Sequence, residues 1–210
     1  MKVMILGATG GTGKETVAAA LAAGHEVTAL ARRPEAMAAK HERLRVVQGD
    51  VLDAGSMRAA LKGQEAVLSA FGPSSGARAG TLISTGIRNL VQAMAEEGVK
   101  RLVFESGLMV GDVRGMNFLK RGMVAIYRAM NRELYLDKVR AEKTVRESNL
   151  EWIIVRPPAL KHAPARGGVR IGPDLDVNLL AGLSHADVAE VMVKCLVGSA
   201  HLGQAVDLSY

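Results

Sequence analysis

The stretch Val3-Met4-Ile5-Leu6-Gly7-Ala8-Thr9-Gly10-Gly11-Thr12-Gly13-Lys14 decides the fold of this 210-residue chain. A short apolar run predicts a buried strand, and glycines 7, 10 and 13 follow it directly at G-x-x-G-x-x-G spacing. Gly7 allows a tight turn, Gly10 lets backbone N–H groups approach a pyrophosphate, and Gly13 lets the next helix pack on the strand. The positive end of that helix, expected over 15–23, then faces the phosphates, and Thr9 and Thr12 add hydroxyl donors.

The residues after this loop complete a βαβ unit. An alanine-rich helix is expected to stop at Gly24, and Glu26-Val27-Thr28-Ala29-Leu30 predicts a second strand. A Walker phosphate loop places four residues between a glycine and Gly-Lys-Ser/Thr, whereas here Lys14 is followed by Glu15. The stretch therefore predicts a dinucleotide site and not a triphosphate site.

The end of the second strand indicates which dinucleotide is bound. A carboxylate at this point binds the ribose 2′-hydroxyl of NAD, whereas arginine suits the 2′-phosphate of NADP. The chain has Ala31-Arg32-Arg33 there, with no acid. Because guanidinium groups pair well with phosphate, Arg32 and Arg33 favour NADP(H) over NAD(H). The alternative is that both arginines are solvated turn residues before Pro34.

Composition limits the classes of protein to which the chain can belong. Hydrophobic residues make up 49% of it, which is enough for one globular domain with a sizeable core. There are 27 lysines and arginines against 21 acidic residues, without the aromatic and basic interleaving typical of nucleic-acid binders. An anionic cofactor accounts for this basic bias. The single cysteine, Cys195, excludes an internal disulfide, and its helical spacing predicts a core residue and not a nucleophile.

The sequence also predicts where the protein is located and what it binds. The chain begins with a strand and not with a signal peptide, and no apolar stretch approaches the ~20 residues that span a bilayer. We expect a cytoplasmic monomer or dimer with no nucleic-acid partner, no membrane partner and no metal site.

The rest of the chain alternates between strand and helix patterns. After the first two strands, further strands are expected over 44–48, 66–70, 101–105, 152–155 and 206–208, the last at the sheet edge. Helices are expected over 34–40, 54–61, 81–97 and 133–148 and from residue 185, whereas 74–80 and 159–182 are expected to be loops. This pattern predicts a single α/β Rossmann-like domain, a doubly wound and mostly parallel sheet of about seven strands with helices on both faces.

Residues after the third and fourth strands are expected to complete the cofactor site, since ligands bind at the carboxyl ends of parallel strands. These residues are Asp50 and Val51 after the third strand, and Ala70, Phe71 and Gly72 after the fourth. Asp50 is placed to accept a hydrogen bond from the adenine amino group. Asp53 is expected to cap the helix that follows, and Ser184 the last helix.

Two irregular segments, 107–132 and 159–183, are expected to form a small substrate-side region. The pattern breaks down from Leu108 to Asn131 into Gly, Met, Arg and Lys, with one short helix expected near 124–130. This segment is either a lid over the cleft or an amphipathic surface segment with a solvated basic face formed by Arg114, Lys120, Arg121 and Arg128.

Several motifs together resemble those of an atypical short-chain dehydrogenase/reductase. They are Gly7-Ala8-Thr9-Gly10-x-Thr12-Gly13, Gly49-Asp50-Val51, Glu147-Ser148-Asn149-Leu150, Arg156-Pro157-Pro158 and Ser184-His185-Ala186-Asp187-Val188-Ala189. The chain is similar to the NAD(P)H-binding subgroup around biliverdin reductase B, also called flavin reductase, and to NmrA-like proteins. The resemblance implies that Pro157, Pro158 and Ala159 line the nicotinamide site. The named relatives have histidine after the two prolines, where this chain has Ala159.

Ordinary members of that superfamily use a serine, a tyrosine and a lysine, with the tyrosine four residues before the lysine. The resemblance implies that Ser106 and Lys138 match the serine and the lysine and are the catalytic residues, with Ser106 also beside the cofactor. The position of the tyrosine is occupied by Leu134, and Tyr135 is one residue away, about 100° round the helix. The usual proton donor is therefore missing.

The missing tyrosine favours an enzyme that transfers hydride directly to a flat conjugated acceptor. The leading hypothesis is an NADPH-dependent oxidoreductase whose acceptor is a flavin, a quinone or another conjugated small molecule. The alternative is a non-catalytic, NmrA-like redox sensor that binds NADP and acts through a protein partner. A nucleotide-sugar epimerase or an isoflavone-type reductase is a third, weaker hypothesis.

Overall fold

One sheet of eight strands organises the computed structural model, which describes residues 1–73, 80–112, 116–173 and 175–210. The strand order is β3-β2-β1-β4-β5-β6-β10-β8, and every neighbouring pair is parallel except β10 and β8. The order reverses between β1 and β4, as in a doubly wound fold. The strands are β1 (Lys2–Leu6), β2 (Glu26–Ala31), β3 (Leu44–Gln48), β4 (Ala66–Ser69), β5 (Arg101–Glu105), β6 (Glu151–Arg156), β8 (Arg170–Gly172) and β10 (Gln204–Ser209).

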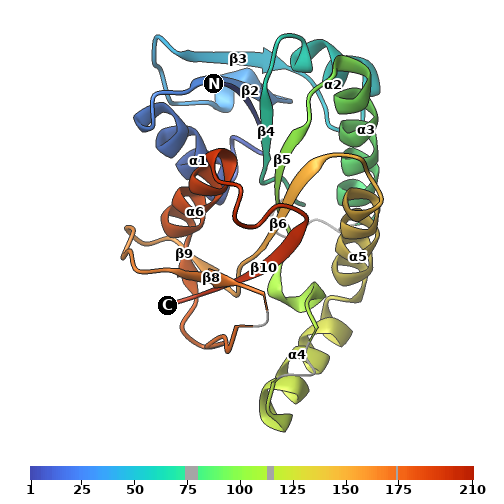
Figure 1. The fold of residues 1–210 in the computed structure, drawn as a ribbon, viewed down its shortest axis with the longest axis vertical. Helices are drawn as coiled ribbons and strands as arrows, with labels where there is room; N and C mark the ends of the chain where they lie inside the picture. Colours follow the sequence, from blue (N-terminus) through green and yellow to red (C-terminus); the bar gives the residue numbers. More distant parts are fainter. Residues whose placement is uncertain (74–79, 113–115, 174) are drawn as a thin grey trace.

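Helices cover both faces of this sheet (Figure 1). One face is covered by α1 (Gly11–Ala22) and α6 (His185–Val197), and the other by α2 (Ala54–Leu61), α3 (Leu82–Glu97) and α5 (Arg132–Arg146). The predicted fold class is therefore confirmed. None of the helices in the described ranges is long and apolar enough to cross a membrane.

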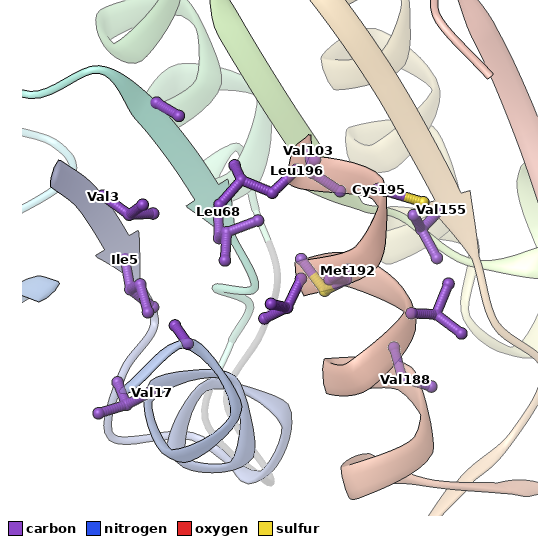
Figure 2. Close-up of a cluster of buried hydrophobic side chains, with 14 of the residues drawn as sticks. Val3, Ile5, Val17, Leu68, Val103, Val155, Val188, Met192, Cys195 and Leu196 are labelled. Atoms are coloured by element: carbon purple, nitrogen blue, oxygen red, sulfur yellow. The ribbon is translucent and has the colours of Figure 1, made fainter. Parts of the chain in front are cut away.

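The apolar side chains of β1, β4, β5 and β6 alternate between two buried cores, because successive side chains of a strand point to opposite faces. Figure 2 shows the core between the sheet and α6, where Met192, Cys195 and Leu196 pack against Leu68 and Val155. Burial raises the pKa of the Cys195 thiol to about 11. The predicted role of this cysteine as a core residue is confirmed.

The structure corrects several predicted elements. Residues 206–208 lie in β10, which is an interior strand, because β8 pairs with it and forms the edge. The segment 159–182 is not wholly irregular, since it contains β8 and also β7 (Leu160–Lys161), which pairs with β9 (Leu183–Ser184) in a second, two-stranded sheet. The helix predicted over 34–40 is only a 3-10 turn, η1 (Pro34–Ala36). The first helix begins at Gly11, four residues before its predicted start.

The segment 108–131 forms a 3-10 turn, η2 (Leu108–Val110), and a helix, α4 (Phe118–Met130), that is longer than predicted. Figure 1 shows α4 extending beyond the rest of the molecule at one end. Most of the predicted loop 74–80, and the predicted basic residue Arg114, lie outside the described residues.

Within the described ranges, side chains cap the starts of four helices, among them α4, where the Asn117 side chain accepts a hydrogen bond from the Lys120 N–H at 3.0 Å. Asp53 accepts a hydrogen bond from the Gly55 N–H at 2.9 Å, and Ser184 accepts one from the Asp187 N–H at 2.9 Å, so both predicted caps are confirmed. The fourth cap comes from a different helix. The fully buried carboxylate of Asp137 on α5 accepts from the N–H groups of Ile83 and Ser84 at 2.7 and 3.1 Å, at the start of α3.

Asp137→Ala is expected to lower the free energy of unfolding by about 2 kcal/mol, because it leaves two buried N–H groups of α3 without acceptors. Urea denaturation measures this change. The matched control is Asp53→Ala, which removes an exposed cap on α2 and is expected to cost about 1 kcal/mol. Equal costs for the two variants would contradict the structural role given to Asp137.

Candidate functional site

A cleft of about 600 Å³ lies at the carboxyl ends of the parallel strands, where the strand order reverses. Its walls come from the loops after β1, β2, β3 and β4 and from the end of β5, α5 and the start of α6. Most of the predicted site residues line it, namely Gly7, Thr9, Gly10, Thr12, Arg32, Arg33, Asp50, Val51, Ala70, Phe71, Gly72 and Lys138.

The turn after β1 leaves room only for glycine at two positions. Gly7 has φ +78°, and a Cβ on it would lie 2.5 Å from the carbonyl oxygen of Ala70. A Cβ on Gly13 would lie 1.9 Å from the carbonyl oxygen of Gly7. This close packing brings the start of α1 to the end of β1. Gly10 is the N-cap and offers no side chain to the first N–H groups of the helix, so those donors face the cleft as an anion site.

Arg32 and Arg33 stand at the other end of the cleft. Both are exposed, and neither takes part in a salt bridge with any residue that the structure describes. Asp50 is half-buried, and its carboxylate accepts the N–H of Leu52 at 3.0 Å. The cleft thus has hydrogen-bond donors for a pyrophosphate in its middle and two unpaired guanidinium groups at one end, which fits a phosphorylated dinucleotide.

Five predicted residues lie outside the lining of this cleft. Gly13 is buried beneath the glycine turn, as its packing role requires. Ser106 is 2% exposed, and its hydroxyl has no hydrogen-bond partner within the described ranges. Pro157 is buried, Pro158 half-buried and Ala159 exposed, whereas the next residue, Leu160, does line the cleft.

Lys138 and Glu105 both line the cleft, and each charge influences the other group. Glu105 is the last residue of β5, and burial raises the pKa of its carboxyl to about 7, although the Lys138 charge and the Thr12 hydroxyl oppose the shift. Burial also lowers the pKa of Lys138, against the charges of Glu105 and Glu142. The Lys138 ammonium donates to the carbonyl oxygen of Ser106. Two titratable groups with shifted pKa values in one cleft are typical of a site of proton transfer.

A chain of polar contacts leads from Glu105 to the molecular surface. The Thr12 hydroxyl donates to Glu105 Oε1 at 3.1 Å and lies 2.9 Å from Nδ1 of His185 on α6. The exposed imidazole of His162 lies beside His185, with ring centroids 4.6 Å apart. Burial and the neighbouring His162 lower the pKa of His185.

Glu105 and His185 were not predicted as site residues from the sequence. The available signal for Glu105 was an acidic residue at the carboxyl end of a buried parallel strand. For His185, the signal was a histidine directly after the cap of the last helix. Gly11 also leaves room for the His185 ring, because a Cβ on it would lie 2.7 Å from that ring. The glycine motif did not indicate this packing role.

No tyrosine lines the cleft among the described residues. Leu134, at the position where the superfamily has its tyrosine, packs against a buried core. The Arg128 guanidinium lies over the Tyr135 ring, with its carbon 5.0 Å from the ring centroid. Tyr127 is exposed on α4. The described lining of the cleft therefore contains no tyrosine, and Leu134 lies in the core at the position of the usual proton donor.

A buried ion pair supports the same wall of the cleft. Glu142, one turn after Lys138 on α5, is 2% exposed and accepts two hydrogen bonds from Arg156 at the end of β6, at 2.9 and 2.6 Å. This bidentate pair connects α5 to the sheet just beyond Lys138. Within the described ranges, no group of three or more histidine, cysteine or acidic residues is arranged to hold a metal ion.

None of the described residues of 108–131 lines the cleft, so in this structure they do not form a lid over it. The alternative, an amphipathic surface segment, is correct in outline. Its exposed face, however, is apolar and not basic: Phe118, Leu119, Met123, Ile126, Tyr127 and Met130 are 37–87% exposed.

A doubly wound sheet with a glycine-lined cleft at its switch point defines a Rossmann dinucleotide-binding domain. The comparison with known families agrees, because a model of the NAD(P)H-binding family matches residues 7–198. The chain belongs to this NAD(P)H-binding family.

Two relatives illustrate the similarity in sequence. The chain is 31% identical over 216 residues to a (4-alkanoyl-5-oxo-2,5-dihydrofuran-3-yl)methyl phosphate reductase of Streptomyces griseus, covering 99% of this chain and 67% of the relative. It is 30% identical over 213 residues to an uncharacterised chloroplastic protein of Arabidopsis thaliana, covering 93% of this chain and 72% of that protein.

Solved structures share the fold. The anaerobilin reductase ChuY of Escherichia coli superposes with a TM-score of 0.82 at 22% identity, covering 100% of this chain and 97% of that chain. A short-chain dehydrogenase/reductase of Veillonella parvula in complex with NADP has a TM-score of 0.77 at 19% identity, covering 100% and 94%.

Gly13→Ala is expected to lower the free energy of unfolding by about 2–3 kcal/mol, because its Cβ overlaps the Gly7 carbonyl and the turn must move. The same movement is expected to weaken NADPH binding at least about tenfold, since the N–H groups of α1 lose their position. Chemical denaturation and a fluorescence titration measure the two effects.

Gly72→Ala is the control for stability, because its added Cβ meets no atom of the described residues within 4 Å. It is expected to change the free energy of unfolding by less than about 0.5 kcal/mol. A Gly13→Ala variant as stable as Gly72→Ala, with unchanged NADPH affinity, would show that the close approach is not required.

Proposed function

We propose that this protein is an NADPH-dependent reductase that transfers hydride to a conjugated small-molecule acceptor such as a flavin or a quinone. The observation on which the proposal rests is that Glu105 and Lys138 line the same cleft as the glycine turn, Arg32 and Arg33. The Streptomyces griseus relative and ChuY are both described as reductases, and this supports the same reaction class.

Different residues of the cleft bind different parts of NADPH. The N–H groups at the start of α1 bind the pyrophosphate, Arg32 and Arg33 bind the 2′-phosphate, and Asp50 accepts from the adenine. Lys138 marks the nicotinamide end, where the protonated ammonium donates to a ribose hydroxyl. When bound, the reduced cofactor supplies the hydride.

Glu105 takes the place of the missing tyrosine as the proton donor. With a pKa of about 7, its carboxyl is protonated in a large fraction of molecules near neutral pH, which is the condition for an efficient general acid. The acceptor gains a hydride and the carboxyl proton, and Glu105 is left as a carboxylate. The Lys138 ammonium and the Thr12 hydroxyl stabilise that carboxylate, and Thr12 and His185 return a proton to it from the surface.

A redox sensor is the second candidate, because the same cleft binds NADPH without the usual Tyr-x-x-x-Lys acid. It predicts tight binding of the cofactor without its oxidation by any acceptor, and a conformational difference between the oxidised and reduced complexes. The experiment below separates the two functions.

NADPH oxidation is expected in the presence of at least one member of a panel of flavins, quinones and a bilin, and NADH is expected to be a poorer donor. Arg32→Ala combined with Arg33→Ala is expected to raise the Kd for NADPH at least about tenfold and to leave that for NADH nearly unchanged, because only NADPH has the 2′-phosphate. Absorbance at the nicotinamide band and titration calorimetry measure these effects.

Arg45→Ala is the matched control for charge, since Arg45 is an exposed arginine on β3 that does not line the cleft. Equal loss of NADPH and NADH affinity in the double arginine variant would contradict the assignment of the 2′-phosphate. Tight NADPH binding with no turnover on the whole panel would contradict the reductase and favour the sensor.

The rate of reduction is expected to fall as pH rises through about 7, because the acid form of Glu105 is then lost. Glu105→Gln is expected to lower kcat by about 100-fold at acidic pH and to abolish this limb of the pH profile. Glu97→Gln, at the end of α3 and outside the cleft, is the control and is expected to retain the limb. A Glu105→Gln enzyme with an unchanged pH profile would assign the proton to another group or to water.

A further inference from the structure

The helix α4 presents an uncommon surface for a helix of a globular domain. It is attached through one side: Val124 is 6% exposed, and the Arg128 guanidinium donates to the carbonyl oxygens of Met109 and Gly111 at 2.7 and 2.8 Å. Lys120, one turn before Val124, forms an ion pair with Asp176. Residues 120, 124 and 128 share one face, and their contacts determine which side of the helix faces solvent.

The side that faces solvent is apolar. Leu119, Met123, Ile126 and Met130 follow each other at helical spacing and are 63%, 37%, 62% and 80% exposed, with Phe118 and Tyr127 beside them at 87% and 46%. Large apolar side chains gathered on one exposed face of a protein mark a surface that contacts another molecule or a membrane. We call this side of the helix the α4 apolar face.

The charge of the same helix indicates what the occupant is. The helix α4 has no acidic residue; of its cations, Lys120 pairs with Asp176 and Arg128 donates to backbone carbonyls, whereas Arg121 is exposed, as is Arg132 at the start of α5. An exposed apolar helix face with exposed cations beside it can lie in the interface of a membrane, with the apolar side chains among the acyl chains and cations such as Arg121 and Arg132 at anionic headgroups. We propose that α4 binds the surface of a membrane that contains anionic lipid.

The shape of the molecule permits this contact. Figure 1 shows α4 at one end of the molecule, beyond the sheet and the other helices, so a flat surface can reach it. The expectation that the protein has no membrane partner rested on the lack of a spanning stretch, and an interfacial helix needs none. The proposal does not depend on the redox chemistry, since none of the residues of α4 lines the cleft.

A second copy of the chain is a poorer occupant. In a twofold contact through the α4 apolar face, the exposed Arg121 would approach its own copy with no acid on the helix to compensate. The helix is also short: its 13 residues span about 20 Å, which is little for the ~800 Å² per partner of a stable interface.

The test is sedimentation of the full chain with vesicles. The protein is expected to bind vesicles of equal parts phosphatidylcholine and phosphatidylglycerol more tightly than vesicles of phosphatidylcholine alone, and to bind the former less tightly as salt is raised. Ile126→Glu is expected to reduce the bound fraction at least about fivefold, since it places a charge in the α4 apolar face. Arg121→Gln is expected to reduce binding to the anionic vesicles only.

Val197→Glu is the matched control, because Val197 is 63% exposed on α6, against 62% for Ile126. It is expected to bind as the unchanged protein does. Circular dichroism and thermal unfolding of both variants confirm that they fold.

Three results would overturn the proposal. The first is no binding to either kind of vesicle, and the second is equal binding by the unchanged protein and Ile126→Glu. The third is a dimer in light scattering that Ile126→Glu dissociates, without vesicle binding, which would assign the α4 apolar face to a second copy of the chain. None of these results depends on cofactor turnover, so the outcome is separate from that of the proposed reductase function.

Discussion

The cofactor cleft depends on one close approach of backbone to backbone, between the turn after β1 and the first turn of α1. The space between the Gly7 carbonyl and Gly13 is too small for any Cβ. This approach places the start of α1 directly beyond the end of β1, with its unbonded N–H groups facing the point where the sheet order reverses. The α1 helix is in turn packed against α6, which brings His185 over Gly11. The glycine turn therefore positions both the phosphate donors and part of the polar chain behind them.

Burial shifts the pKa values of two side chains at the other end of the cleft. A carboxyl and an ammonium group are both withdrawn from water there, and each becomes easier to neutralise, so the pKa of Glu105 rises and that of Lys138 falls. Thr12 connects this pair to His185, which leads to the exposed His162. A cleft of this kind can hold a proton without the tyrosine that ordinary relatives use. The ion pair between Glu142 and Arg156 keeps α5 in place against β6 while Lys138 faces the cleft.

Much of the fold and of the cofactor half of the site could be predicted, because those features are local in sequence. The spacing of glycines 7, 10 and 13 within one turn, the apolar runs of the parallel strands, and Arg32 and Arg33 at the end of β2 are all local patterns. Predictions that depended on pairing between distant segments were less successful. β10 was expected at the sheet edge because its partner β8 is a three-residue strand inside a glycine-rich segment, and so short a strand has no recognisable periodicity.

The sequence by itself determined the doubly wound domain, the glycine turn and the absence of a tyrosine four residues before Lys138, since these follow from residues that are neighbours along the chain. Only the tertiary structure decided which polar groups share the cleft. Thr12 meets Glu105 across 93 positions and His185 across 173, and no local pattern encodes contacts of that range. The tertiary structure also decided the orientation of α4. Its amphipathic pattern did not show which of its faces packs against the rest of the protein. The contacts of Val124 and Arg128 decided it, because they hold Lys120 and Arg128 toward the body of the protein and leave the apolar side of the helix, with Arg121, in solvent.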